Sequence, residues 1–341
     1  MLKYSESCRT ADIPVREGCR TAMECNRKRE RSGIKKHGLS KCALALAALI
    51  WGAGFSFSQM ALDAGFGASA MLVGKFGTAA VLSGIVFFKT IREQLTWRIF
   101  LKILPIGIVL ILSFYTQTYG LLLSTPSNCA FITAAYVVIT PLLWRIIFHK
   151  KPPRSVYLAS VICFAGVVTL SVKFTTGNSF GIAGGISFGA GDILTLVCAV
   201  LFAVHIVASE KLVTEIDFRV LMFSQFTVAA IVALTMFFIT ERDFSAVRTP
   251  KGLVSIIYLG VGSTFFSYNL QTSAQRYVNS NTTALLLSLE SLFGVIFAVL
   301  IGYDKPTLKL LIGGALILLP ILIPELVQIL RRRDKHDTAT P

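Results

Sequence analysis

Strongly apolar stretches of about 20 residues recur along the chain and are separated by short polar segments. About 20 apolar residues form a helix roughly 30 Å long, which matches the hydrocarbon core of a bilayer. Gly, Ala, Ser and Thr are mixed with the apolar residues throughout, as helix packing in lipid favours, and the alternation typical of a membrane β-barrel is absent. Ten membrane-spanning helices are predicted, at 42–62, 68–88, 99–122, 127–147, 155–172, 189–211, 218–238, 252–274, 280–301 and 306–328.

The division of these spans predicts two halves of opposite orientation. The longest polar segment, 173–188, is rich in Gly and Ser and separates five spans from five. Because five is odd, the second half enters the membrane from the other side, and such inverted repeats place a substrate near the midplane between them. We therefore expect an all-α integral membrane protein of two inverted five-helix repeats, 42–172 and 189–328, joined by an extracytoplasmic linker at 173–188.

Composition agrees with this class: hydrophobic residues make up 54%, charged residues only 15%, and the mean hydropathy is +0.69. A net charge of +15 raises the question of nucleic-acid binding, but the placement of the charges argues against it. If the N-terminus is inside, 26 of the 33 Lys and Arg residues lie on the inner side. The positive-inside rule then places both termini in the cytoplasm, with the protein in the bacterial inner (plasma) membrane. No nucleic-acid partner is expected.

The two ends of the chain are polar and basic. Residues 1–41 lack periodicity and are predicted to be a disordered cytoplasmic tail, and 329–341 form a second basic tail. The N-terminal segment lacks the early apolar region of a signal peptide. Met23 opens "MECNRKRERSGIKKHG", a more usual lead-in, so translation from Met23 is an alternative to Met1.

Residues typical of enzymes and metal sites form no recognisable motif. The seven cysteines show no metal-ligand spacing, and the chain lacks a Walker A loop and a nucleophile elbow. No cofactor, metal, disulfide or catalytic residue is therefore predicted, and transport, if it occurs, would be secondary or facilitative.

The two halves also show weak internal similarity around spans four and nine. Each begins with Asn and small residues, meets a polar pair in mid-span, and ends in a Lys-Pro turn before a Gly-containing span. The polar pairs are Thr140-Pro141 and Glu290-Ser291.

Several segments carry a more specific resemblance. They are "LIWGAGFSFSQMAL", "SFYTQTYGLLLSTPSNCAFITAAYVVITPLL" and, most strongly, "VGSTFFSYNLQTSAQRYVNSNTTALLLSLESLFGVIFAVLIGYD". In these residues the chain resembles the EamA-type permeases of the drug/metabolite transporter (DMT) superfamily, over roughly 40–328. The family's pattern of Thr, Tyr, Gln, Ala-Gln-Arg and Leu-Glu is met by Thr264, Tyr268, Gln271, Ala274-Gln275-Arg276 and Leu289-Glu290.

The departures from that pattern indicate a subgroup. Ser291 stands where the family usually has a Pro that would kink the helix. Asp304 replaces the Glu of the second Gly-Glu turn, and Lys151-Pro152 replaces the first turn. Lys75 occupies a position where many relatives carry Arg.

Two charged residues lie within predicted spans. Glu290 is near the centre of span nine, where a carboxylate is costly, so it either contacts substrate, takes part in coupling, or bonds a neighbouring helix. Lys75 lies about seven residues into span two, where it either pairs with a carboxylate or an anionic group, or snorkels outward along its stem. Snorkelling or a structural role is the favoured interpretation for Lys75.

The resemblance implies that spans one, three, four, six and eight line a central cavity, whose wall would combine aromatic rings with a few hydrogen-bonding groups. Each such residue has a helix–helix contact as its alternative role. Tyr115 and Tyr119 share a helix face, which fits either a lining stripe or an interfacial aromatic belt. His205 can relay protons or simply pack with a hydrogen bond. The cavity candidates are Trp51, Lys75, Tyr115, Gln117, Tyr119, Asn128, Tyr136, Thr140, His205, Tyr268, Gln271, Thr272, Glu290 and Ser291.

The resemblance implies a transporter of an amino acid or similar small metabolite that works by alternating access, with export favoured. Proton coupling through Glu290 or His205 is a secondary hypothesis. The alternatives are an intramembrane enzyme or lipid-handling protein, and a scaffold that transports nothing. The expected partners are a small-molecule substrate and the lipid bilayer, and the oligomeric state is not indicated.

Overall fold

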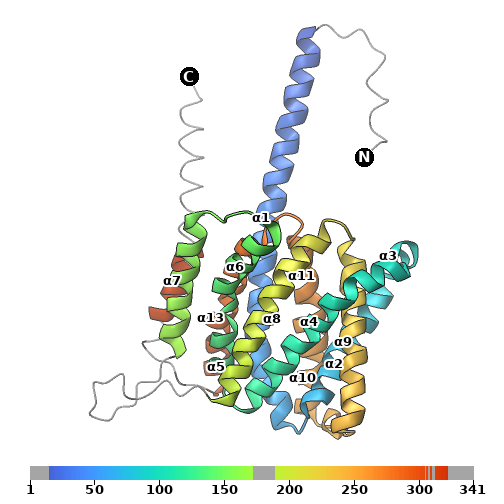
Figure 1. Cartoon of the computed structure of the whole chain (residues 1–341), viewed down its shortest axis with the longest axis vertical. Helices are drawn as coiled ribbons and strands as arrows, with labels where there is room; N and C mark the ends of the chain where they lie inside the picture. The colour runs from blue at the N-terminus through green and yellow to red at the C-terminus, as the bar shows by residue number, and fades with distance from the viewer. Residues whose placement is uncertain (1–14, 172–188, 304, 306–307, 309–311, 322–341) are drawn as a thin grey trace. The chain divides into compact units, whose positions relative to one another are not determined.

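A computed structural model describes residues 15–171, 189–303, 305, 308 and 312–321. The chain forms two compact units, Met1–Leu39 and Ser40–Pro341. In the described part every regular element is a helix (Figure 1). The helices are α1 (Val15–Asp63), α2 (Ala68–Val86), α3 (Phe88–Gln94), α4 (Trp97–Leu122), α5 (Pro126–Thr133), α6 (Tyr136–Phe148), α7 (Arg154–Ser171), α8 (Ala190–Val213), α9 (Phe218–Thr240), η1 (Ser245–Arg248), α10 (Pro250–Ile257), η2 (Tyr258–Phe266), α11 (Ser267–Ala274), α12 (Ser280–Leu287) and α13 (Leu289–Ile301).

Eight of the predicted spans coincide with helices long and apolar enough to cross a bilayer. The positions of spans five and ten hold shorter apolar helices, Arg154–Gly166 and Ile312–Ile321. Parts of both predicted spans, and all of the predicted linker at 173–188, lie outside the described residues. The structure therefore confirms an all-helical membrane protein with eight candidate spans.

The N-terminal tail differs from the expectation of disorder. From Val15 onward the chain is already helical, as the first part of α1. Arg, Lys, Glu, Ala and Met are good helix formers, and no Pro follows Pro14 in this segment, so nothing in the sequence ends the helix before span one.

Three spans are built from more than one helical element. Span four breaks between α5 and α6 at Ala134 and Ala135. Here the N–H groups of Ala135, Val137 and Val138 bond the carbonyl three residues back instead of four. Span nine breaks similarly at Ser288, between α12 and α13, where the Ser291 N–H donates to the Ser288 carbonyl three residues back. Span eight contains the wide π-helical turn η2. Such interruptions free or re-aim backbone and side-chain groups, and they often lie at functional sites.

Helices of the first half pack against helices of the second. The α4 helix lies against α8 and α9, and α2 lies against α9 and η2 (Figure 1). Spans four and nine meet through α5 with α13 and α6 with α12. Glycines allow two of these approaches, because a Cβ on Gly107 would lie 2.8 Å from Val228 Cβ and one on Gly260 would lie 2.7 Å from Thr78 Cβ.

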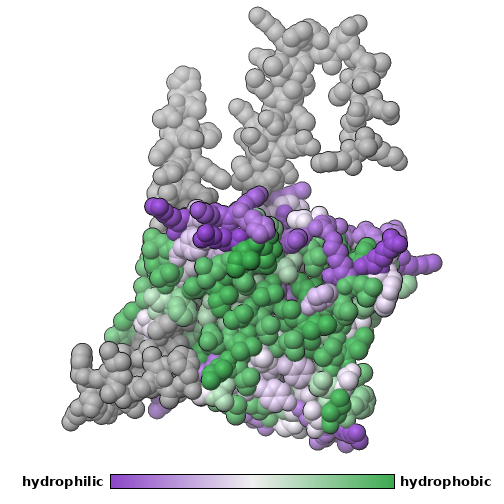
Figure 2. Space-filling view, viewed as in Figure 1, coloured by the Kyte–Doolittle hydropathy of each residue, from purple (hydrophilic) through white to green (hydrophobic). Residues whose placement is uncertain are grey.

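The surface exposes large apolar side chains, as expected of a protein embedded in a bilayer. Large apolar residues such as Ile85, Ile146 and Ile239 are exposed, and Figure 2 shows an apolar belt below a hydrophilic rim. That rim lies at the end of the bundle where α3 and the C-terminal end of α6 are found (Figures 1 and 2). We call this the inner end, because the Lys- and Arg-rich connections between spans meet there. The opposite end is called the outer end.

Candidate functional site

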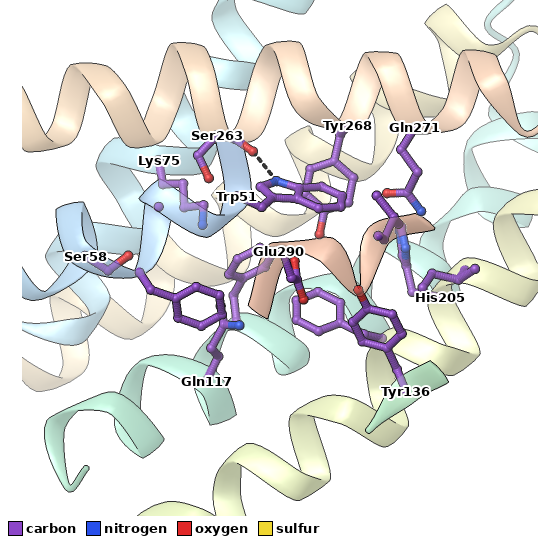
Figure 3. A pocket seen from close by; sticks show the side chains of 16 residues that line it. Trp51, Ser58, Lys75, Gln117, Tyr136, His205, Ser263, Tyr268, Gln271 and Glu290 are labelled. Carbon is purple, nitrogen blue, oxygen red and sulfur yellow. Dashed lines mark hydrogen bonds between the residues drawn. The ribbon is translucent and has the colours of Figure 1, made fainter. Parts of the chain in front are cut away.

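A cavity lies in the middle of the second unit between helices of both halves. The space in it that the centre of a water molecule can occupy is about 50 Å³. Its wall combines seven aromatic or imidazole side chains with several polar groups, and Figure 3 shows the labelled side chains converging on it. The lining residues are Trp51, Gly54, Phe55, Ser58, Lys75, Phe114, Gln117, Tyr136, Phe202, His205, Ile206, Ser263, Tyr268, Gln271, Leu287 and Glu290.

More than half of the residues predicted from the sequence are brought together here. Spans one, two, three, four, six, eight and nine each contribute at least one, although no two of these residues lie close together in the sequence except in span eight. They are Trp51, Lys75, Gln117, Tyr136, His205, Tyr268, Gln271 and Glu290.

Trp51 and Tyr268 form a rigid aromatic wall on one side of the cavity. Their ring centroids are 4.8 Å apart in an edge-to-face arrangement. The Trp51 indole Nε1 donates a 2.6 Å hydrogen bond to the Ser263 backbone carbonyl (Figure 3). Ser263 lies in η2, so its carbonyl is available because the π-helical turn alters the usual backbone pairing. The interrupted helix thus fixes the orientation of the indole.

Lys75 lies inside the bundle and does not snorkel. Its side chain is only 4% exposed, and Nζ lies 3.7 Å from the centroid of the Phe114 ring. Within the described part of the chain, no carboxylate oxygen lies within 4 Å of Nζ. Of the two favoured roles, outward snorkelling is excluded and a structural role remains, because the aromatic face of Phe114 offers a site for the ammonium group inside the protein.

Glu290 lies in span nine, next to the break between α12 and α13. It is the second residue of α13 and is 5% exposed. Its backbone carbonyl faces span one closely, since a Cβ on Gly52 would lie 2.9 Å from that oxygen. The helix is interrupted at Ser288 although Ser291 replaces the usual Pro.

Several buried polar atoms around the cavity have no hydrogen-bond partner among the described residues. They are the Tyr136 hydroxyl, His205 Nδ1, both amide atoms of Gln271 and Glu290 Oε1. Most buried polar atoms in proteins are paired, and each exception needs a reason. Because all of these atoms belong to residues that line one cavity, they are suited to hydrogen-bond a polar molecule placed between them.

The other nitrogen of His205 has a structural role. Nε2 lies 2.9 Å from Gln225 Oε1, and Gln225 Nε2 donates to Met222 Sδ at 3.2 Å. The Thr272 hydroxyl donates to the same sulfur at 3.4 Å. Spans six, seven and eight are therefore linked by this chain of contacts, which was the alternative role considered for His205 and Thr272.

Four further candidates with described side chains, Thr140, Ser291, Tyr115 and Tyr119, are not among the lining residues. Thr140 is buried and donates to the Tyr136 carbonyl at 2.7 Å, and Ser291 donates to the Ala130 carbonyl at 2.8 Å. Tyr115 donates to Ser69 Oγ at 3.3 Å, and its ring stacks on Tyr119, which is 39% exposed. The side chain of Asn128 is not among those that the structure describes. Tyr115 and Ser291 thus make contacts between helices, Thr140 bonds within its own helix, and Tyr119 lies partly at the surface.

Sequence reasoning missed several lining residues, and one group of them carried a signal. Gly54, Phe55 and Ser58 follow Trp51 at helical spacing, so they share its face of α1. Phe114 and Phe202 gave no such signal, because a Phe inside a span is indistinguishable from any lipid-facing or core residue. Within the described ranges no group of three His, Cys, Asp or Glu side chains is placed to hold a metal ion.

Comparison with known proteins decides the family. The model of the EamA-like transporter family matches the chain twice, over residues 39–172 and 189–323. The chain belongs to the EamA-like transporter family.

Two relatives in the archaeon Archaeoglobus fulgidus, each named an uncharacterized transporter, cover most of this EamA-like chain. One is 30% identical over 287 residues, which is 83% of the chain and 84% of the relative. The other is 25% identical over 280 residues, or 80% of the chain and 92% of the relative. A solved structure titled only as the crystal structure of a protein shares the fold, with a TM-score of 0.66 at 16% identity, and it covers 84% of this chain and 96% of its own. Family and relatives identify a membrane transporter rather than an enzyme.

Proposed function

We propose that this EamA-like protein carries a small zwitterionic metabolite, such as an amino acid, through the central cavity by alternating access. The observation that carries the proposal is that two side chains able to carry opposite charges line the same buried cavity. The Lys75 ammonium and the Glu290 carboxyl group both line it, and neither has an ion-pair partner within 4 Å among the described residues. A molecule with one carboxylate and one ammonium group complements both.

The physical argument rests on the cost of isolated charges in the membrane. A buried charge is costly unless it is paired, so a substrate that supplies both counter-charges relieves Lys75 and Glu290 together. Trp51, Tyr268 and Phe114 supply apolar surface between them, and the unpaired atoms of Tyr136 and Gln271 offer further hydrogen bonds. A singly charged molecule satisfies only one of the two groups.

An inverted repeat would provide the two alternating states, and the packing supports it. The shift in numbering that takes Asn128 to Asn281 also takes Gly107 to Gly260 and Tyr115 to Tyr268. Gly107 and Gly260 make corresponding contacts, the first from span three to span seven and the second from span eight to span two. Packing pairs that exchange in this way are expected when two halves are related by a pseudo-two-fold axis.

Two finer features belong to the same proposal. Both termini are placed in the cytoplasm and the protein in the inner membrane, on the positive-inside rule. Export is the direction that the family resemblance favours. Coupling to protons through Glu290 is a secondary part of the proposal, because a carboxyl group in this position can take up a proton when the substrate leaves.

The test is flux of labelled amino acids and other small metabolites into proteoliposomes that contain the purified full chain. Lys75→Met and Glu290→Gln should each reduce kcat/KM about a hundredfold, since removing one partner of a buried charge contact costs several kcal/mol. Lys102→Met and Glu215→Gln are matched controls, because this pair forms an exposed ion pair outside the cavity. Unchanged flux in both cavity variants would overturn the zwitterion proposal.

The pH dependence of the same flux tests coupling. If Glu290 carries the proton, Glu290→Gln should flatten the dependence of the wild type. Wild-type flux with a wild-type pH profile in this variant would end the coupling hypothesis.

A further inference from the structure

Beneath the cavity, on its inner side, the helices of both halves are joined around one carboxylate. Glu210, near the C-terminal end of α8, accepts hydrogen bonds from the Ser280 backbone N–H at 2.8 Å and from the Trp144 indole Nε1 at 3.2 Å. The Ser280 hydroxyl donates to the same carboxylate oxygen. The side chain of Glu210 thus links span six to span four and to the start of span nine.

This cluster lies directly against the cavity lining. The carbonyl oxygen of Ile206, a lining residue one turn before Glu210, accepts a 2.8 Å hydrogen bond from Gln275 Nε2 and lies 3.2 Å from the Ser280 hydroxyl. Ser280 is 0% exposed, Gln275 3% and Ile206 3%. These three residues are therefore buried on the side of the cavity that faces the inner end.

The corresponding positions at the outer end are arranged differently. The spacing of the lining residues Trp51, Gly54 and Phe55 is repeated by Phe202, His205 and Ile206, which relates span one to span six. The same relation takes Ser58 to Ser209 and Gln59 to Glu210.

The outer members of these pairs do not close the cavity. Ser209 is fully buried, whereas Ser58 lines the cavity and is partly exposed. Gln59 donates to Asp63 on its own helix, at 2.8 Å, instead of joining another span. A hydrogen-bonded seal therefore surrounds Glu210, and its counterpart Gln59 does not reproduce it.

We propose that Glu210, Ser280 and Trp144 form an inner latch, which keeps the inner end of the cavity closed and must open in each transport cycle. The proposal rests on the proposed function only in assigning the latch to a transport cycle. Glu210 is a positioning residue, since it does not line the cavity. Its carboxylate is suited to the task because hydrogen bonds to a charged acceptor are strong and geometrically defined, yet are readily exchanged for water when the inner end opens.

The experiment measures hydrogen–deuterium exchange of the purified full chain in lipid nanodiscs, without substrate. Glu210→Ala should raise exchange in the peptide covering 279–287 about tenfold, as expected for the loss of charge-assisted hydrogen bonds. Glu210→Gln keeps an acceptor oxygen and should show a smaller increase. The matched control is Gln59→Ala, which should leave this peptide unchanged.

Two milder variants keep the test decisive if Glu210→Ala does not fold. Trp144→Phe removes only the indole donor, and Ser280→Ala removes only the hydroxyl. Each should raise exchange at the inner end about threefold. Unchanged exchange in all folded variants, or an equal increase at the outer end, would overturn the latch.

Flux in proteoliposomes separates the two proposals. A raised exchange at the inner end in a protein that transports no zwitterion would overturn the proposed substrate and leave the latch. Normal zwitterion flux with unchanged exchange in the latch variants would overturn the latch and leave the proposed function.

Discussion

The inner and outer ends of the cavity are built from corresponding segments of the two halves, yet they are closed to different degrees. At the inner end His205 and Gln271 are each 1% exposed, and Glu210 with Ser280 lies beneath them. At the outer end Ser58 and Gln117 are partly exposed.

The difference lies in the polar side chains rather than in the helices. The helices supply similar frames at both ends, including a break in span four and another in span nine. At the inner end, buried hydrogen bonds run between spans, as from Gln275 to Ile206. At the outer end the Gln117 amide makes a single long contact, 3.4 Å to Thr133 Oγ1. A few polar residues can thus close one end of the cavity more tightly than the other.

The largest effect on stability is expected where span one packs against span nine. Gly52→Ala should lower the free energy of unfolding by about 3 kcal/mol, because overpacking against backbone cannot be relieved by a side-chain rotation. The new Cβ would lie 2.5 Å from Phe293 Cβ and 2.8 Å from Gly294 N. Thermal denaturation of the purified protein measures the change.

Gly77→Ala is the control for this prediction, since a Cβ there meets no atom within 4 Å. Equal stability of the two variants would contradict the close packing of spans one and nine at Gly52.

A second pair of variants compares the polar contacts of the two ends directly. His205→Leu should destabilise the protein by about 2 kcal/mol, because it leaves Gln225 Oε1 buried without its partner at 2.9 Å. Gln117→Leu at the outer end should cost less than about 1 kcal/mol, since its contact is long and the side chain is partly exposed. Denaturation curves of equal midpoint would contradict the contrast between the ends.

The smallest effect concerns the charged connection at the inner end. Burial alone would raise the pKa of Asp217, but hydrogen bonds from Arg219 and the nearby charge of Arg276 lower it to about 2. Asp217→Asn should therefore reduce stability by about 1 kcal/mol at neutral pH, as for a partly screened ion pair. Because the folded pKa lies below the ordinary Asp value of 3.8, this contribution is present above about pH 4 and is lost as the pH falls toward 2.

The outer counterpart for this comparison is Asp63→Asn. Asp63 accepts from two neutral groups, Gln59 Nε2 and the Tyr303 hydroxyl, so the substitution should change stability less. The free energy of unfolding of both variants, measured as the pH is lowered, tests this comparison. Equal losses of stability would show that Arg219 and Arg276 do not strengthen the contribution of Asp217.

Much of the cavity could be predicted because polar residues inside a membrane are costly and therefore informative. Glu290, Lys75 and His205 were singled out as polar groups inside spans and Gln271 through the family resemblance, and all four line the cavity. The same argument failed for Thr140, because a Thr hydroxyl can bond a carbonyl one turn back on its own helix and needs no cavity.

Other features depend on contacts that a single span does not reveal. The choice between snorkelling and an inward position for Lys75 could not be made from the sequence, because it depends on the ring of Phe114, which belongs to another helix. The π-helical turn that presents the Ser263 carbonyl to Trp51 has no Pro or Gly-Gly signal that distinguishes it from the rest of span eight.

The sequence by itself determined the membrane environment of this protein, its membrane-spanning helices and its family. These follow from the length of the apolar stretches, the placement of charges and local motifs, all of which can be read from the sequence. Tertiary structure alone decided which residues meet in the cavity and which partners hold them. The physical reason is that membrane helices pack through close contacts between small and polar groups of distant spans. The contacts of Gly52 with span nine and of Glu210 with Ser280 exist only once both halves are in place.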